Sequence, residues 1–152
     1  MAITIRAATE RDQEAIVALV RSERMNPFDL HWRRFLVAID AKGVAGTVQL
    51  RRHLDGSREL GSLVVRPDMR RRGIAARLID ALMLFAQGRV YMITGSRFAS
   101  HYQHWGFAPI EATSAPVGIL RNYVLGRLVG IVSPPMGAKP SPLAILTRQA
   151  LA

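Results

Sequence analysis

The sequence predicts an α/β protein with a mixed, mainly antiparallel sheet flanked by helices. Three short strand-like runs, at 34–40, 44–53 and 58–65, are joined by tight turns, and the second turn contains Asp55 and Gly56, a pair typical of hairpins. Apolar residues then recur with helical period up to Gly88, and a strand at 90–94 follows, so the strands at 58–65 and 90–94 should pair in parallel. At 152 residues, the chain is long enough to bury a sizeable core in one domain.

The other elements follow from the same signals. Residues 3–7 alternate as a strand, and Thr9 with Asp12 predicts the capped start of a helix that ends near Arg24. A further helix is expected at 96–105. We expect one domain over 1–152, with a core at about 3–110 and a C-terminal extension at 111–152, which holds a helix at 116–132, a Pro/Gly-rich connector at 134–142 and a last strand at 143–148. Three roles stay open for this extension: covering a substrate pocket, forming a dimer face, or completing the core, which we rank first.

The chain contains no cysteine. This excludes a disulfide scaffold, a cysteine metal site and a thiol nucleophile. Polar residues interrupt the first apolar positions, so no signal peptide is predicted, and no apolar window is long enough to span a membrane. We therefore expect a cytoplasmic protein that does not bind membranes.

The stretch from Leu60 to Ala76 is the most informative part of the sequence. A β-branched run ends at Val65, a proline follows, and three arginines at 70–72 lead through Gly73 into the predicted helix. The first amides of a helix have no intrahelical acceptor and carry the positive end of its dipole, so they attract anions. Small side chains at Gly73 and Ala75 let a phosphate approach the backbone. This pattern favours a pyrophosphate site; the alternative is a surface arginine cluster next to a turn glycine.

At these residues a family resemblance appears. The order Arg70-Arg71-Arg72-Gly73-Ile74-Ala75 resembles the Arg/Gln-x-x-Gly-x-Gly/Ala signature of the GCN5-related N-acetyltransferases (GNAT family), whose loop binds the pyrophosphate of acetyl-coenzyme A. The run 99–107, with Tyr102 four residues before Gly106, is similar to another family segment, although Ser96 replaces a common asparagine. The resemblance implies acetyl-CoA as co-substrate and no metal. The cofactor-binding residues it implies are Leu63, Val64, Val65, Arg70, Arg71, Arg72, Gly73, Ile74, Ala75 and Ala76.

Two residues are candidates for acid and base catalysis. Glu59 stands 14 residues before Gly73, where histone-modifying members of the family place a catalytic glutamate, and it would deprotonate the amine directly or through a water. Strand alternation would put Glu59 on one face with Gly61, Leu63 and Val65. Tyr102 would protonate the coenzyme A sulfur. The alternatives are a solvated glutamate after a turn and a tyrosine that packs in the core.

Other polar and aromatic residues are weaker candidates. The segment between the first two strands often lines the acceptor pocket in this family, which makes Asn26, His31 and Trp32 possible contacts, although ordinary loop roles are favoured. His53, His101 and His104 have no accompanying carboxylate or cysteine pattern, so packing or solvated histidines are favoured over metal ligands.

The function implied by the resemblance is an N-acetyltransferase that moves an acetyl group from acetyl-CoA to a primary amine of unknown identity, by direct attack in a ternary complex. The net charge of +10 would favour binding to a nucleic acid, but it would equally favour the polyanion coenzyme A. A third reading is that the excess of arginine reflects a GC-rich coding bias. No nucleic-acid partner is expected, since aromatic residues are not interleaved with the arginines; the partner is a small-molecule or peptide amine, and a homodimer is possible. A non-catalytic acyl-CoA sensor and a basic nucleic-acid-binding protein remain as alternatives.

Overall fold

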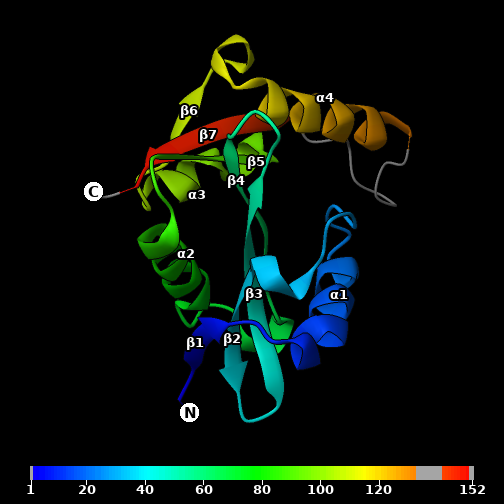
Figure 1. The fold of residues 1–152 in the computed structure, drawn as a ribbon, viewed down its shortest axis with the longest axis vertical. Coiled ribbons are helices and arrows are strands. Elements are labelled where there is room, and N and C mark those ends of the chain that lie inside the picture. The colour runs from blue at the N-terminus through cyan, green and yellow to red at the C-terminus, as the bar shows by residue number, and fades with distance from the viewer. Residues whose placement is uncertain (1, 133–141, 151–152) are drawn as a thin grey trace. The chain divides into compact units, whose positions relative to one another are not determined.

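A computed structural model describes residues 2–132 and 142–150. The fold is mixed α/β, with seven strands in mostly antiparallel pairing and helices beside them (Figure 1). The chain forms two compact units, each built from separate stretches. The first comprises Met1–Arg51 and Leu60–Ala86, and the second comprises Arg52–Glu59 and Gln87–Ala152. The hairpin of β3 (Gly43–Arg52) and β4 (Arg58–Val65) therefore contributes to both units.

The first unit has strand order β1-β2-β3-β4. Strand β1 (Thr4–Ala7) pairs antiparallel with β2 (Phe35–Asp40), and β2 pairs antiparallel with β3, with a register shift between Ala38 and Ile39. Its helical elements are η1 (Glu10–Asp12), α1 (Gln13–Ser22), η2 (Trp32–Arg34), η3 (Pro67–Met69) and α2 (Ile74–Phe85). The predicted capping box is present. The Thr9 side chain accepts from the Asp12 amide, and the Asp12 side chain accepts from the Thr9 amide.

Apolar residues of the first unit pack against its strands in two places. One cluster joins α1 to β2 and β4 and contains Ala8, Ile16, Val20, Leu30, Phe35, Val37 and Val64. Helix α2 approaches β3 closely at Gly46, where an added Cβ would lie 3.1 Å from Leu78 Cδ1 and 3.3 Å from Ile74 Cγ2. The glycine therefore allows the start of α2 to lie directly on the strand, which positions the loop that precedes the helix.

The second unit has strand order β5-β7-β6, with both pairs antiparallel. Its elements are β5 (Arg89–Gly95), η4 (Ser96–Phe98), α3 (Ala99–Gln103), β6 (Ala108–Ile110), η5 (Ala112–Ser114), α4 (Val117–Val132) and β7 (Leu143–Gln149). Ile145 and Leu146 of β7 are buried, and Leu146 pairs with the buried Met92 of β5. The C-terminal extension thus completes the core of this unit, as ranked first from the sequence.

Several predicted boundaries and elements differ from the structure. The helix expected at 96–105 is a 3-10 turn followed by the five-residue α3. Strand β6 was not predicted, and β7 lies between β5 and β6. Helix α2 is capped by Ala86, two residues before the predicted Gly88. Most of the connector at 134–142 lies outside the described residues.

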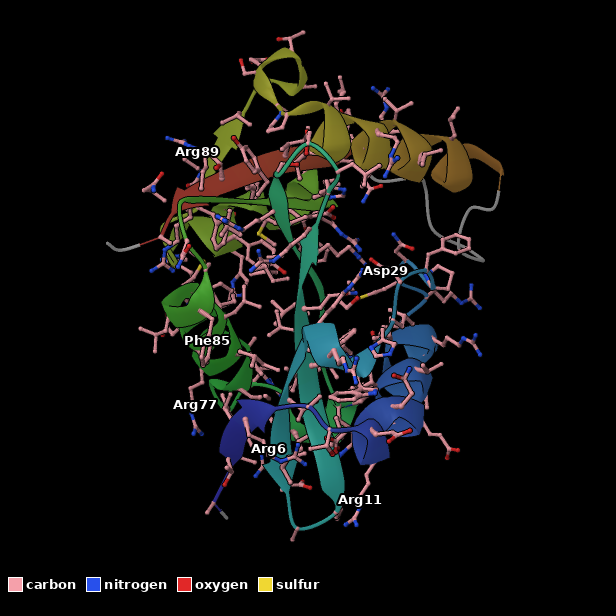
Figure 2. All side chains as sticks on the ribbon, viewed as in Figure 1. Arg6, Arg11, Asp29, Arg77, Phe85 and Arg89 are labelled. Atoms are coloured by element: carbon pink, nitrogen blue, oxygen red, sulfur yellow. The ribbon has the colours of Figure 1, made fainter. Side chains whose placement is uncertain are left out.

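The charged residues are spread over both units. Arg6, Arg11 and Arg77 lie at the surface of the first unit, and Arg89 is exposed at the start of β5 in the second (Figure 2). Phe85, at the end of α2, is also 72% exposed. Within residues 2–132 and 142–150, no helix is long and apolar enough to cross a membrane.

Candidate functional site

The loop from Arg70 to Gly73 has the geometry of an anion-binding turn. Gly73 is the N-cap of α2 with φ of 73°, and Arg71 is also left-handed with φ of 59°. A Cβ placed on Gly73 would meet no heavy atom within 4 Å, so space is open at the helix N-terminus. The first hydrogen bond of the helix is donated by the Arg77 amide to the Gly73 carbonyl at 3.1 Å. The amides ahead of it, at 74–76, therefore precede the intrahelical hydrogen-bond ladder.

The three loop arginines differ in their surroundings. Arg70 donates to the carboxylate of Glu23 at 2.6 Å and to the Val65 carbonyl at 3.0 Å, so it bridges the end of α1 and the end of β4. Arg71 and Arg72 are exposed. From the sequence, all three arginines were expected to supply positive charge to the same place. In the structure, Arg70 instead forms an ion pair with Glu23 of the first unit.

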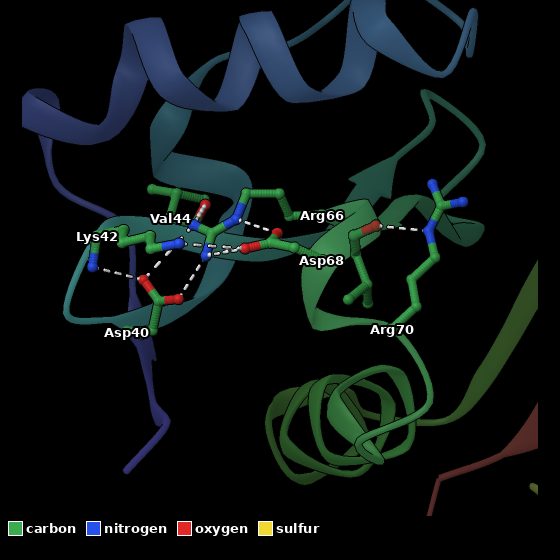
Figure 3. A network of polar contacts seen from close by, with 7 residues as sticks. Asp40, Lys42, Val44, Arg66, Asp68 and Arg70 are labelled. Atoms are coloured by element: carbon green, nitrogen blue, oxygen red, sulfur yellow. Dashed lines mark hydrogen bonds and ion pairs between the residues drawn. The ribbon is translucent and has the colours of Figure 1, made fainter. Parts of the chain in front are cut away.

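A partly exposed ion-pair network, centred on Arg66, restrains the chain just before this loop (Figure 3). Arg66 donates to Asp40 at 2.5 Å and to Asp68 at 2.6 Å, and it also reaches the Val44 carbonyl at 3.3 Å. Hydrogen bonds from Arg66 lower the pKa of both aspartates, and the same bonds, that to Asp68 first, raise the pKa of Arg66. The network ties the β2–β3 turn to η3 and thereby restricts the loop's starting point. The sequence did not predict this network, because Asp40 and Arg66 are 26 residues apart.

Strand β4 has a left-handed residue, Ser62, in its middle. This residue has φ of 51°, and its carbonyl accepts from Thr47 Oγ1 at 2.8 Å, while its hydroxyl lies 2.8 Å from the side-chain amide of Gln49 and 3.3 Å from Arg51. Burial nevertheless alternates from Leu60 to Val65, since Gly61, Leu63 and Val65 are half-buried and the residues between them are buried. The expectation that Glu59 lies on the same face as Gly61, Leu63 and Val65 stays a prediction.

The cofactor residues predicted on β4 have different environments. Val64 is buried in the apolar cluster beneath α1, whereas Leu63 and Val65 are half-buried. The Val65 carbonyl already accepts from Arg70. The predicted contact of their backbone amides with a pantetheine arm stays a prediction.

Glu59 is buried in the second unit and belongs to a hydrogen-bonded group. Only 4% of the residue is exposed, so the alternative of a solvated glutamate is wrong. His53 Nε2 lies 2.8 Å from Glu59 Oε2, and Asn122 Nδ2 donates to the same oxygen at 2.9 Å. We name these three residues the Glu59 cluster. Asn122 was not predicted, since it lies 63 positions away on α4.

The tip of the β3–β4 hairpin is fastened to the N-terminus of α4. Asp55 Oδ2 accepts from the Gly118 amide at 2.8 Å, and Asp55 Oδ1 accepts from the amide and hydroxyl of Ser57. These bonds, that from the Ser57 hydroxyl first, lower the pKa of Asp55 to about 2. A Cβ on Gly118 would lie 2.5 Å from His53 Cβ, so only glycine allows this close contact.

Tyr102 lies on α3 in the second unit and is half-buried. Burial raises the pKa of its hydroxyl, and a hydrogen bond with Thr94 opposes the rise. The ring packs against Trp105 at 5.6 Å between centroids, and Trp105 in turn contacts the edge of His101 at 4.7 Å. Tyr102 is therefore protonated at neutral pH, as a proton donor must be.

The weaker candidates have local structural roles. His31 caps η2 by accepting from the Arg33 amide, and Asn26 accepts from the Phe28 amide in its loop. Trp32 packs beside the apolar cluster of the first unit, and its amide donates to Gln13. His53 pairs with Glu59, while His101 and His104 are exposed. Among the described residues, no group of three or more His, Cys, Asp or Glu side chains could hold a metal ion.

One family model matches the chain. A family model described as an acetyltransferase (GNAT) domain matches residues 31–109, just over half of the chain, including Glu59, the arginine loop and Tyr102. No curated protein matches the chain significantly.

Solved structures share the fold at low sequence identity. An N-acetylglutamate synthase from Neisseria gonorrhoeae, complexed with coenzyme A and N-acetyl-glutamate, matches with a TM-score of 0.78 and 17% identity over 100% of this chain and 36% of the synthase chain. This chain thus spans about a third of that protein. Rv2747 from Mycobacterium tuberculosis, in complex with coenzyme A, matches with a TM-score of 0.70 and 21% identity over 97% and 99% of the two chains. A GNAT-family acetyltransferase from Staphylococcus aureus matches with a TM-score of 0.70 and 19% identity over 99% and 100%.

Proposed function

Because this chain belongs to the GNAT acetyltransferase family, we propose that it transfers an acetyl group from acetyl-CoA to a primary amine by direct attack in a ternary complex. The observation that carries the proposal is the turn at Gly73. It combines a left-handed glycine, open space at the start of a twelve-residue helix, and the exposed Arg71 and Arg72. Backbone amides at 74–76 would bind the pyrophosphate of acetyl-CoA, and the two arginines would add charge.

Transfer of the acetyl group requires one proton to leave the amine and one to reach sulfur. The amine nitrogen attacks the thioester carbonyl, an N–C bond forms, and the C–S bond breaks. Glu59 accepts the amine proton, directly or through a water, as a general base. Tyr102 donates its proton to the departing sulfur of coenzyme A. Acetyl-CoA supplies the activated acetyl group and the pantetheine arm, for which the amides of Leu63, Val64 and Val65 are the proposed partners.

Calorimetric titration with acetyl-CoA tests the first half of this proposal. We expect saturable one-to-one binding that Gly73→Glu abolishes, because the variant places a carboxylate where the pyrophosphate would bind. Gly56→Glu is a matched control: Gly56 has a similar φ of 83° and equally open space, but it lies in the hairpin turn. The control should bind normally. Failure of the folded wild-type protein to bind acetyl-CoA would overturn the proposal.

Release of coenzyme A tests the second half. The chain has no cysteine, so a thiol-reactive chromogen reports only the product thiol. The acceptor screen begins with amino acids, L-glutamate first, because the similar N. gonorrhoeae synthase was solved with N-acetyl-glutamate, and it continues with polyamines, aminoglycosides and peptides. Acetyl-CoA binding without turnover on any amine would favour a non-catalytic sensor.

A further inference from the structure

The Glu59 carboxylate requires stabilisation, because a buried negative charge without partners is strongly unfavourable. The side chain is 6% exposed, and so is that of His53. Two donors meet at one carboxylate oxygen, His53 Nε2 at 2.8 Å and Asn122 Nδ2 at 2.9 Å. As a base, Glu59 must be ionised before it takes a proton, and an ionised carboxylate only accepts hydrogen bonds, so in that state Nε2 of His53 is the donor in this contact.

The two donors come from different elements and constrain the carboxylate from two directions. His53 directly follows β3, while Asn122 lies in the second turn of α4. One donor alone would leave the terminal torsion of the glutamate broad. Two donors on the same oxygen restrict that torsion and so contribute to the orientation of the carboxylate.

Helix α4 is held in register with this pair. Gly118 and Asn122 are four residues apart and lie on the same face of the helix. Gly118 contacts His53, and its amide donates to Asp55 at 2.8 Å. The face that docks on the hairpin is therefore the face that delivers Asn122 to Glu59.

We infer that His53 and Asn122 are positioning residues that orient the Glu59 carboxylate for proton abstraction, and that α4 belongs to the acetyl-transfer apparatus. The inference rests on the proposed function, in which Glu59 is the base. It assigns a catalytic contribution to the C-terminal extension, beyond its part in the core. General bases must be held within a narrow geometry, and a displacement of about 1 Å can cost about 100-fold in rate.

Steady-state kinetics of matched variants test the inference. His53→Phe and Asn122→Leu remove the donors while keeping similar volume, and we expect each to lower kcat about 10- to 100-fold with the KM for acetyl-CoA changed less than about 2-fold. His53→Gln, which retains a side-chain N–H, should recover most of the loss. Arg121→Ala, at an exposed position next to Asn122, is the control and should leave kcat unchanged.

A double-mutant cycle separates positioning from general stabilisation. If both residues act through Glu59, adding His53→Phe or Asn122→Leu to Glu59→Gln should lower kcat no further. Additive losses, or lower melting temperatures with kcat unchanged for the folded fraction, would overturn the inference.

The outcomes also distinguish this inference from the proposed function. Loss of kcat in Glu59→Gln, with normal kcat in His53→Phe and Asn122→Leu, would overturn the positioning role and leave the base in place. Normal kcat in Glu59→Gln would overturn both the base and its positioning residues, whereas absent acetyl-CoA binding by the wild type would reject the acetyltransferase itself.

Discussion

The arginine loop and the Glu59 cluster differ in how their geometry arises. The loop consists of consecutive residues whose backbone torsions, especially at Arg71 and Gly73, create the proposed binding turn. The Glu59 cluster joins side chains that lie 6 and 63 positions apart in the sequence. A local backbone motif can be identified from residue order, whereas a cluster of distant side chains depends on how helices and strands pack. The loop is therefore proposed to control binding, and the cluster to control chemistry.

The largest expected effects separate those two roles. Glu59→Gln and Tyr102→Phe should each lower kcat about 100-fold or more, because general acids and bases typically contribute that much. Neither should change the calorimetric Kd for acetyl-CoA more than about 3-fold. Gly73→Glu should show the reverse pattern, with lost binding as its first effect. Equal losses of binding and rate in all three variants would contradict the division.

Substitution of one glycine in each region by alanine compares how much the free energy of unfolding depends on the contact beside the Glu59 cluster and on the arginine loop. Gly118→Ala should destabilise the protein by about 1–3 kcal/mol in spite of better helix propensity, because the new Cβ would lie 2.5 Å from His53 Cβ. Gly73→Ala meets no atom and should cost only about 1–2 kcal/mol for its left-handed torsion. Thermal melts measure both, at about 2–4 °C per kcal/mol for a chain of this size.

The two glycine variants should also differ in activity. Gly118→Ala should lower kcat, since it displaces His53 and the face of α4 that carries Asn122. Gly73→Ala should instead weaken acetyl-CoA binding. A more stable Gly118→Ala protein with unchanged kcat would show that the contact between α4 and the hairpin is less tight than described.

Acid stability offers a smaller test in the first unit. The hydrogen bond from Arg6, with bonds from Thr9, lowers the pKa of Asp12 to about 2 from 3.8. Because the folded-state pKa is lowered, the stabilisation is present above about pH 4 and is lost as the pH falls towards 2. Arg6 is 40% exposed, so solvent screening reduces the expected contribution to about 1 kcal/mol. The melting temperatures of wild type and Asp12→Asn should differ at pH 6 and converge near pH 2; a constant difference would contradict this.

The smallest expected effect concerns Arg70. Its ion pair with Glu23 joins side chains that are 46% and 34% exposed, and such pairs contribute about 0.2–1 kcal/mol. If pyrophosphate competes with Glu23 for this arginine, Glu23→Gln should tighten acetyl-CoA binding up to about 5-fold. Glu14→Gln, at an exposed position near the start of α1, is the control. Weaker binding by Glu23→Gln would show instead that the pair supports the loop.

Most elements of the fold were predictable because their signals are local. The hairpin turn at Asp55 and Gly56, the capping box at Thr9 and the helical period after Gly73 depend on residues within a few positions of one another. Strand β6 escaped prediction because three residues carry too little periodic signal. The place of β7 between β5 and β6 escaped because sequence order does not determine strand order.

The sequence by itself determined the fold class, the family and the arginine loop, because these depend on residue order and on the conformational freedom of Gly73. It also identified Glu59 and Tyr102 as candidates. Tertiary structure alone decided that Glu59 is buried, that His53 and Asn122 meet at its carboxylate, and that Arg66 is paired with Asp40. The physical reason is that burial and long-range hydrogen bonds arise when distant segments pack, and no local sequence period encodes which side chains then meet.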